Sequence, residues 1–373
     1  MLTLCTLYAA QPIQPLFEQE LHLSKFQAVI FTTAIMLPLG IAPIVYGFLL
    51  ETVSSKNMLR WAILFLGILE LIFSLNSHYL ILLNLRGLQG VLIPAILTSI
   101  MSYISQNSTQ DKVQQAISTY IGITILGGFL GRFFSGFLSD IFGWRFFFAL
   151  LGVLLIGMFF ILESLTKDVK PSFIKPSWKR IAHVIRIPHN FFIYITMFTV
   201  FFVFQGILNF IPFELRLIEG DFNGGKVGLV YAGYAIGLVV SLNAMRIIRA
   251  SGSESKAMLI GGIIYLISIQ LFHVRSFTSM FLVMFMFCLG MFIVHAIGSG
   301  YVNKLAQEYK AISNGLYIST YYAGGTLGTF VPGIVYEHFG WHWFLSVLSC
   351  VVTLSVILLF LLYRKMNAST KYV

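Results

Sequence analysis

Apolar segments of about 20 residues follow one another along almost the whole chain, and a helix of that length can cross the hydrocarbon core of a bilayer. The segments are continuously apolar, whereas the strands of a membrane β-barrel would alternate. Twelve such segments cover residues 1–17, 26–49, 58–76, 79–103, 114–139, 144–165, 188–212, 227–248, 256–274, 278–304, 313–337 and 342–363. We therefore predict an all-α integral membrane protein with twelve transmembrane helices.

The charged residues are few and unevenly placed. Only 10% of the chain is charged, against about 25% in a soluble domain, which excludes a soluble fold. Seventeen Lys and Arg residues fall on one side of the predicted helices and five on the other. This inside-positive bias predicts that both termini face the cytoplasm. It also explains the net charge of +10 without nucleic-acid binding.

The longest hydrophilic stretch, residues 166–187, falls midway along the chain and carries six Lys or Arg residues. It predicts a basic cytoplasmic linker between an N-terminal six-helix bundle, residues 1–165, and a C-terminal six-helix bundle, residues 188–373. Contact with anionic lipid headgroups is an alternative reading of its charge.

An internal repeat supports two pseudo-symmetric bundles. A shift of 197 residues superimposes one glycine-rich segment on another without a gap. It places Gly127, Gly128, Gly131, Phe142, Gly143 and Trp144 on Gly324, Gly325, Gly328, Phe339, Gly340 and Trp341. Duplicated membrane bundles are typical of secondary transporters, which hold their substrate at the bilayer midplane.

The first segment is unusually short. It begins at Met1 without a basic flank, and its 17 residues reach only about 25 Å at about 1.5 Å per residue. We expect either a missing N-terminal piece or a shortened first helix, and we favour the missing piece.

The loop after the second segment carries Gly47, Glu51 and Lys56 at family-typical positions. It resembles the signature loop of the major facilitator superfamily, G-x-x-x-D-[RK]-x-G-[RK]-[RK]. That resemblance implies a cytoplasmic gate. Thr52 and Ser55 depart from the pattern, which weakens the expected latch.

The fourth segment contains Arg86-Gly-Leu-Gln89-Gly90, which resembles the R-x-x-Q-G motif of the same superfamily. A guanidinium inside a membrane costs several kcal/mol, so Arg86 should face protein or water and have a partner. The resemblance implies a role in the transport path, often in proton coupling. A structural ion pair that locks the N-terminal bundle is the alternative.

The fifth segment is rich in glycine and carries Arg132. Small residues at these spacings let helices approach closely. The run resembles the antiporter motif of proton-driven exporters, and in particular the arabinose-efflux-permease-like branch, although its usual proline is missing. The predicted helix-packing glycines are Gly127, Gly128, Gly131, Gly324, Gly325 and Gly328. Packing does not require a charge at Arg132.

Three charged residues lie at about the same depth along their predicted helices. Glu70, Arg86 and Arg132 each lie about 10 Å below the outer surface at about 1.5 Å per residue. We expect Glu70 to lie between the two guanidiniums, as a structural partner rather than a proton carrier. Neutralising one arginine would leave the other to hold an anionic substrate.

Uncharged polar residues complete the predicted pathway. Gln11 and Gln14 lie on the first segment, and Gln205 and Asn209 lie on the seventh, where they fit a central polar cavity or bonds to neighbouring backbone. His295 lies deep in the tenth segment. Its usual pKa of about 6.5 suits proton exchange, although many buried histidines only satisfy hydrogen bonds.

These features predict a major facilitator superfamily transporter in the bacterial cytoplasmic (inner) membrane. We expect it to export a drug-like compound, sugar or metabolite in exchange for protons, as a monomer, without a cofactor or metal. Uptake by the same fold is the alternative, and a membrane sensor or scaffold is a remote one. The chain lacks G-x-S-x-G, H-E-x-x-H, C-x-x-C and P-loop motifs, so we do not expect an enzyme.

Overall fold

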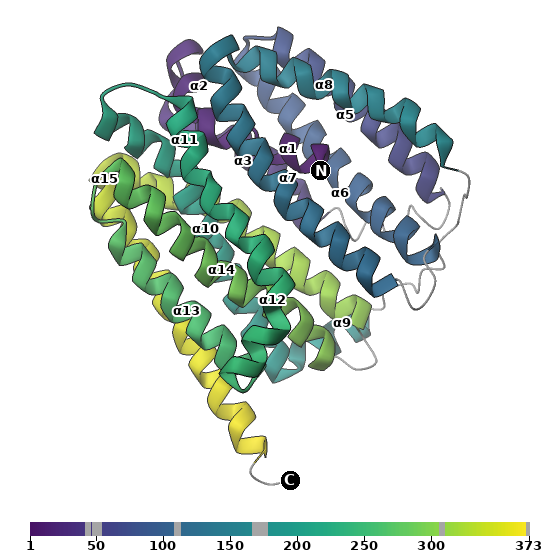
Figure 1. The fold of residues 1–373 in the computed structure, drawn as a ribbon, viewed down its shortest axis with the longest axis vertical. Coiled ribbons are helices and arrows are strands. Elements are labelled where there is room, and N and C mark those ends of the chain that lie inside the picture. The colour runs from purple at the N-terminus through teal and green to yellow at the C-terminus, as the bar shows by residue number, and fades with distance from the viewer. Residues whose placement is uncertain (42–45, 47–53, 108–112, 166–177, 306–309, 371–373) are drawn as a thin grey trace. The chain divides into compact units, whose positions relative to one another are not determined.

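The computed structural model describes residues 1–41, 46, 54–107, 113–165, 178–305 and 310–370, and all secondary structure in these ranges is helical (Figure 1). Nine of the described helices are long and apolar enough to cross a membrane. The longest of them bends at Gly340 and therefore forms two membrane spans. The remaining two spans are the first, which is interrupted between residues 2 and 20, and the second, which begins at Lys25 and is shorter. The predicted twelve-helix, all-α membrane fold is confirmed.

The chain divides into two compact units. The first comprises Met1–Lys175 and Asp221–Leu229. Within it, α5 packs against α6 and α8, and α7 packs against α1 and α8. Its described helices are α1 (Leu2–Tyr8), η1 (Gln11–Ile13), α2 (Gln14–Glu20), α3 (Lys25–Met36), η2 (Leu37–Gly40), α5 (Ser55–Leu75), α6 (Tyr79–Asn107), α7 (Val113–Phe142), α8 (Trp144–Ile161), η3 (Leu162–Ser164) and most of α11 (Gly224–Val230).

The second unit comprises Pro176–Gly220 and Val230–Val373. Here α15 packs along α10, and α13 packs against α14. Its described helices are α9 (Trp178–Arg186), α10 (Pro188–Glu219), η4 (Tyr231–Ala235), α12 (Ile236–Ser251), α13 (Glu254–Leu271), α14 (Phe277–Leu305) and α15 (Lys310–Thr370).

Serine side chains begin three of these helices. Ser24 accepts a hydrogen bond from the backbone of Gln27, whose side chain in turn accepts from the Ser24 backbone, which is a complete capping box. Ser54 caps α5 and Ser253 caps α13 in the simpler one-sided way. Each cap satisfies a backbone amide that would otherwise lack a partner at the helix end.

Two glycines explain why the repeat keeps the sequence Phe-Gly-Trp. Gly143 has φ 80° and separates α7 from α8, and Gly340 has φ 77° and bends α15. A residue with a Cβ rarely adopts this backbone conformation. The two positions are 197 residues apart, so the same left-handed turn joins the last two helices of each repeat.

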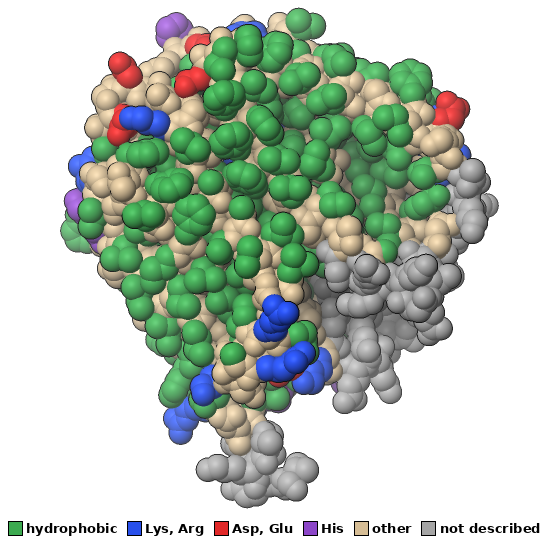
Figure 2. Space-filling view, in the orientation of Figure 1, with side chains coloured by type: hydrophobic (Ala, Val, Ile, Leu, Met, Phe, Trp, Pro, Cys, Tyr) green, Lys and Arg blue, Asp and Glu red, His purple; other side chains and the backbone are tan. Residues whose placement is uncertain are grey.

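Apolar side chains cover the outer faces of the helices. On α12, for example, Leu242 is 70% exposed, Met245 61% and Val239 54%. Figure 2 shows hydrophobic side chains spread over the visible faces, with Lys and Arg side chains gathered near the end of the second unit where the C-terminus lies. Such a surface is compatible with lipid and not with water.

Two predicted helices have different limits. The first segment, expected as one short helix, is interrupted: α1 ends at Tyr8, and the 3₁₀ turn η1 precedes α2. Pro12 and Pro15 cause the interruption, because proline has no amide hydrogen to donate. The seventh segment, expected to end at Pro212, continues as α10 to Glu219. Neighbouring groups in a membrane bundle can satisfy the carbonyl that such a proline leaves without its helical partner.

Candidate functional site: buried polar groups around the interrupted first helix

The interruption of the first helix brings backbone and side-chain amide groups into the interior of the first unit. Tyr8 ends α1, Gln11 begins η1 and Gln14 begins α2. The side chains of both glutamines are fully buried, and Gln14 donates a 3.0 Å hydrogen bond from Nε2 to Oγ1 of Thr32 on α3. Both predicted helix-one amides therefore face the protein interior.

Arg132 lies against this interruption. Its fully buried side chain projects from α7 and donates 2.7 Å hydrogen bonds from Nε to Oε1 of Gln11 and from Nη1 to the carbonyl of Gly128. Its Cζ lies 3.8 Å from the centroid of the Tyr8 ring, which is a cation–π contact. The positive charge is thus oriented by uncharged groups on the first helix and on α7 itself.

Arg86 contacts the same helix one turn earlier. From α6 it donates hydrogen bonds of 3.3 Å from Nη1 and Nη2 to the carbonyl of Thr6, the last turn of α1. It also donates at 2.9 Å to Oε1 of Gln89 and at 3.4 Å to the carbonyl of Phe31. This bond places Arg86 and Gln89 on one face of α6. Arg86 therefore joins α6, α1 and α3.

Glu70 on α5 completes a polar cluster with Arg86, Thr6 and Gln89. The charge of Arg86 acts on its fully buried carboxylate, and Thr6 and Gln89 are the neighbouring polar side chains. Thr6 and Gln89 lie close enough to act on the Glu70 carboxylate as hydrogen-bond donors, although none of these groups forms a hydrogen bond of regular geometry with it. Glu70 therefore lies beside one guanidinium and two potential hydrogen-bond donors.

The expectation that Glu70 lies between two guanidiniums needs correction. Arg86 acts on Glu70, whereas Arg132 contacts Tyr8 and Gln11. Equal depth in the membrane does not fix position around the bundle, and counting residues along a helix predicts depth alone. The two arginines instead share the interrupted first helix as a common neighbour.

In the second unit, the predicted amides and histidine occupy α10 and α14. Gln205 and Asn209 are fully buried, and Asn209 donates from Nδ2 to the carbonyl of Gln205 at 2.7 Å. His295 is half-buried, with Nδ1 3.0 Å from the Tyr317 hydroxyl, and its ring stacks on Tyr321 at 4.7 Å. The backbone-bonding alternative therefore applies to Asn209, and His295 belongs to an aromatic cluster.

The predicted cytoplasmic gate loop lies mostly outside the described residues, which include neither Gly47 nor Glu51. Lys56 is described, and its ammonium donates to the carbonyls of Glu163 and Leu165 at the end of η3. That contact caps the C-terminal end of a helix with a positive charge.

The repeated glycines pack helices together inside each unit. A Cβ on Gly127 would lie 2.6 Å from the carbonyl oxygen of Met1, and one on Gly131 would lie 2.5 Å from the Cα of Cys5, so both glycines bring α7 against α1. A Cβ on Gly324 or Gly328 would meet the α10 backbone. The buried Gly128 and Gly325 lie beside them. The contacts of these glycines lie within each unit.

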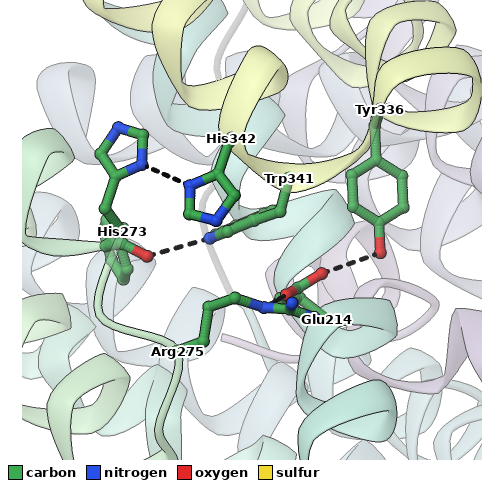
Figure 3. A network of polar contacts seen from close by, with 7 residues as sticks. Glu214, His273, Arg275, Tyr336, Trp341 and His342 are labelled. Carbon is green, nitrogen blue, oxygen red and sulfur yellow. Dashed lines mark hydrogen bonds and ion pairs between the residues drawn. The ribbon is translucent and has the colours of Figure 1, made fainter.

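A polar network in the second unit was not predicted (Figure 3). Glu214, 1% exposed, accepts a hydrogen bond of 2.5 Å from Nε of Arg275 and one of 3.3 Å from the Tyr336 hydroxyl. Trp341 donates from Nε1 to the carbonyl of Phe272 at 2.9 Å. An acidic residue two positions after Pro212, inside an apolar run, was the available sequence signal.

Together these features define a polytopic membrane protein with charged and amide groups buried on interrupted helices, which is a transporter-like interior. No cluster of three potential metal ligands occurs in the part of the chain that the structure describes. The family model of the Major Facilitator Superfamily matches residues 1–251 and 217–372. The chain belongs to this superfamily, whose members are transporters and not enzymes.

Its relatives are transporters of bacteria. The chain is 23% identical to the inner membrane transport protein YnfM of Escherichia coli (strain K12), over 98% of this chain and 89% of the relative. It is 24% identical to the probable nitrate transporter NarT of Staphylococcus epidermidis, over 87% and 82% of the two chains. The crystal structure of a bacterial homolog of the lysosomal transporter Spinster has the same fold, with TM-score 0.76, 14% identity and coverage of 97% and 92%.

Proposed function

We propose that this protein exports a small solute (a drug-like compound, sugar or metabolite) in exchange for protons by alternating access. The glycine-rich fifth helix, which resembles the antiporter motif, supports export. We place the protein in the bacterial inner membrane, as for the relative YnfM, with both termini in the cytoplasm because of the inside-positive charge distribution.

The observation that carries the proposal is the buried guanidinium of Arg132 on an interrupted helix. Burying a charge costs several kcal/mol, and helix packing alone would be served by an apolar residue. Its fixed partners Tyr8 and Gln11 are the first candidates to contact the solute alongside it. Gln14, Gln205 and Asn209 are further polar candidates for the pathway.

Proton coupling has two candidate groups. The cluster of Glu70, Arg86, Thr6 and Gln89 holds a carboxylate beside a guanidinium. His295 offers an imidazole that contacts a tyrosine hydroxyl. We favour Glu70, although the sequence alone predicted a structural role for it, because its fully buried carboxylate lies beside one guanidinium and not between two, and intramembrane carboxylates commonly carry protons.

Uptake is a second candidate, favoured by the charge of the interior. The fully buried charged side chains described in the first unit are Glu70, Arg86 and Arg132, which leave one net positive charge. Such an interior attracts an anion, and a proton on Glu70 would increase that attraction. An anion and a proton would then move together, which is symport. The relative that is named a probable nitrate transporter fits this reading.

Reconstitution into liposomes with an imposed pH gradient and a panel of sugars, drugs and organic anions separates these possibilities. Antiport moves the solute against the proton flow, and symport moves it with the flow. Arg132→Gln removes the buried charge, and Arg246→Gln removes an exposed one on α12 as the matched control. The absence of flux with every solute, in a folded protein, would favour a sensor or scaffold and contradict the proposal.

A further inference from the structure

Two histidines join separate segments at one end of the second unit. His273 lies between α13 and α14, and His342 lies two residues after the bend of α15 at Gly340. Their Nδ1 atoms are 2.9 Å apart, and their rings stack with a 10° angle between planes (Figure 3). His342 is exposed and His273 is half-buried, so protons from solvent reach the pair.

The repeat supplies a comparison at the same position of the fold. In the first unit, Arg145 stands where the second unit has His342, and Trp144 stands where it has Trp341. Arg145 forms a 3.2 Å ion pair with Glu20 and donates a 2.8 Å hydrogen bond to Ser77. Trp144 donates to the same Glu20 carboxylate at 2.7 Å.

In both units, side-chain contacts hold the start of the last helix. The first unit uses the Arg145–Glu20 ion pair, and the second unit uses the His273–His342 contact. Arginine keeps its charge at all accessible pH values, whereas histidine titrates between about pH 5 and 8. The contacts of the first unit at this position contain no histidine. The contact in the second unit depends on the protonation of the His273 and His342 imidazoles.

The hydrogen bond between the two Nδ1 atoms requires one donor and one acceptor. Two neutral rings satisfy this, and so does one neutral ring with one protonated ring. When both rings are protonated, both Nδ1 atoms are donors, the bond is lost, and two positive charges lie side by side. The second protonation therefore replaces an attraction by a repulsion.

Within the described part of the chain, neither histidine forms an ion pair with a carboxylate. Glu214 on α10 is already engaged by Arg275 and Tyr336. Arg216 on α10 adds a further positive charge near Tyr336. Burial and the charge of His342 lower the pKa of His273 below its usual value. Glu337 and His338 on α15, in the turn before Gly340, complete the titratable groups near the bend.

We propose that the His273–His342 contact is a pH-dependent clasp. It holds the connection between α13 and α14 to the bend of α15 while at least one ring is neutral, and it opens when both rings are protonated. The adjacent bond from Trp341 to the Phe272 carbonyl loosens with it. The clasp makes one half of the molecule acid-sensitive at a place where the other half is not, whatever solute the protein carries.

A double-mutant cycle on the full chain in lipid nanodiscs tests the proposal. The thermal unfolding midpoint is measured for the wild type, His273→Ala, His342→Ala and the double variant, at about pH 8 and about pH 5. We expect the pair to raise the midpoint by roughly 2 °C at the higher pH and to lose or reverse that effect at the lower pH. A coupling that is equal at both pH values would overturn the clasp.

Two controls keep the result interpretable. Asparagine can mimic Nδ1 without titrating, so His273→Asn and His342→Asn should keep the contact and flatten its pH dependence. The cycle of Glu20→Gln and Arg145→Gln should give the same coupling at both pH values, because that pair contains no histidine. If the alanine variants do not fold, the asparagine variants decide alone: acid sensitivity equal to that of the wild type contradicts the proposal.

Discussion

The guanidinium of Arg132 donates a 2.7 Å hydrogen bond from Nε to Oε1 of Gln11, across 121 residues of sequence. The bond joins the glycine-rich helix α7 to the interruption of the first helix. It fixes a buried positive charge where the backbone is irregular, and membrane transporters place irregular backbone along cavities. The proposed function depends on this relationship.

Replacement of Arg132 by alanine should reduce solute flux by about 10- to 100-fold and leave the protein folded in membranes. The estimate follows from the loss of charge-assisted hydrogen bonds worth about 1.5–3 kcal/mol. Initial flux rates in liposomes, with size-exclusion profiles as a check of folding, measure this effect. Retained flux would remove Arg132 from the pathway.

Glu70 and Arg86 should be energetically coupled. Glu70→Gln leaves the buried guanidinium of Arg86 without the carboxylate that balances it, at a cost of up to about 3–5 kcal/mol. Arg86→Gln in the same protein should recover part of this loss, since no isolated charge then remains. Unfolding midpoints of the two single variants and the double variant give the coupling, and a value of zero would show that the two groups do not act on each other.

The close approach of α7 and α1 can be tested with two glycines of the first unit. A Cβ at position 131 would lie 2.5 Å from the Cα of Cys5, so Gly131→Ala should destabilise by about 1–3 kcal/mol. Nothing lies within 4 Å of a Cβ at Gly87, which makes Gly87→Ala the matched control. That variant should be neutral or stabilising by up to about 1 kcal/mol, because alanine favours helix. Equal midpoints for both variants would contradict the close packing.

The left-handed turn of the repeat predicts a second effect of alanine. Gly340 has φ 77° and ψ −173°, a combination that essentially only glycine adopts, so Gly340→Ala should cost about 1–3 kcal/mol through backbone strain alone. Gly143→Ala should behave alike, since Gly143 has φ 80°. Gly315 lies in open space without a positive φ, and Gly315→Ala serves as the control. Thermal midpoints would refute the shared turn if only one of the two repeat variants were destabilised.

The sequence predicted the fold more completely than the site. Hydrophobic length predicted all twelve spans, and the gap predicted between segments 313–337 and 342–363 contains the bend at Gly340. It misplaced Arg132 relative to Glu70, because periodicity gives the depth of a residue and its helix face but not which helix that face contacts. It missed Glu214, which the continuation of α10 beyond Pro212 carries into the protein interior.

The most direct test of the account measures proton movement when solute is added. Wild-type protein and the Arg132→Gln and Arg246→Gln variants are reconstituted into liposomes that contain a pH-sensitive dye, and each solute of the panel is added in turn. The account predicts that at least one solute moves protons through wild type and Arg246→Gln, and that Arg132→Gln loses at least about nine-tenths of that signal. Proton movement that is equal in all three proteins, or absent with every solute, would contradict it.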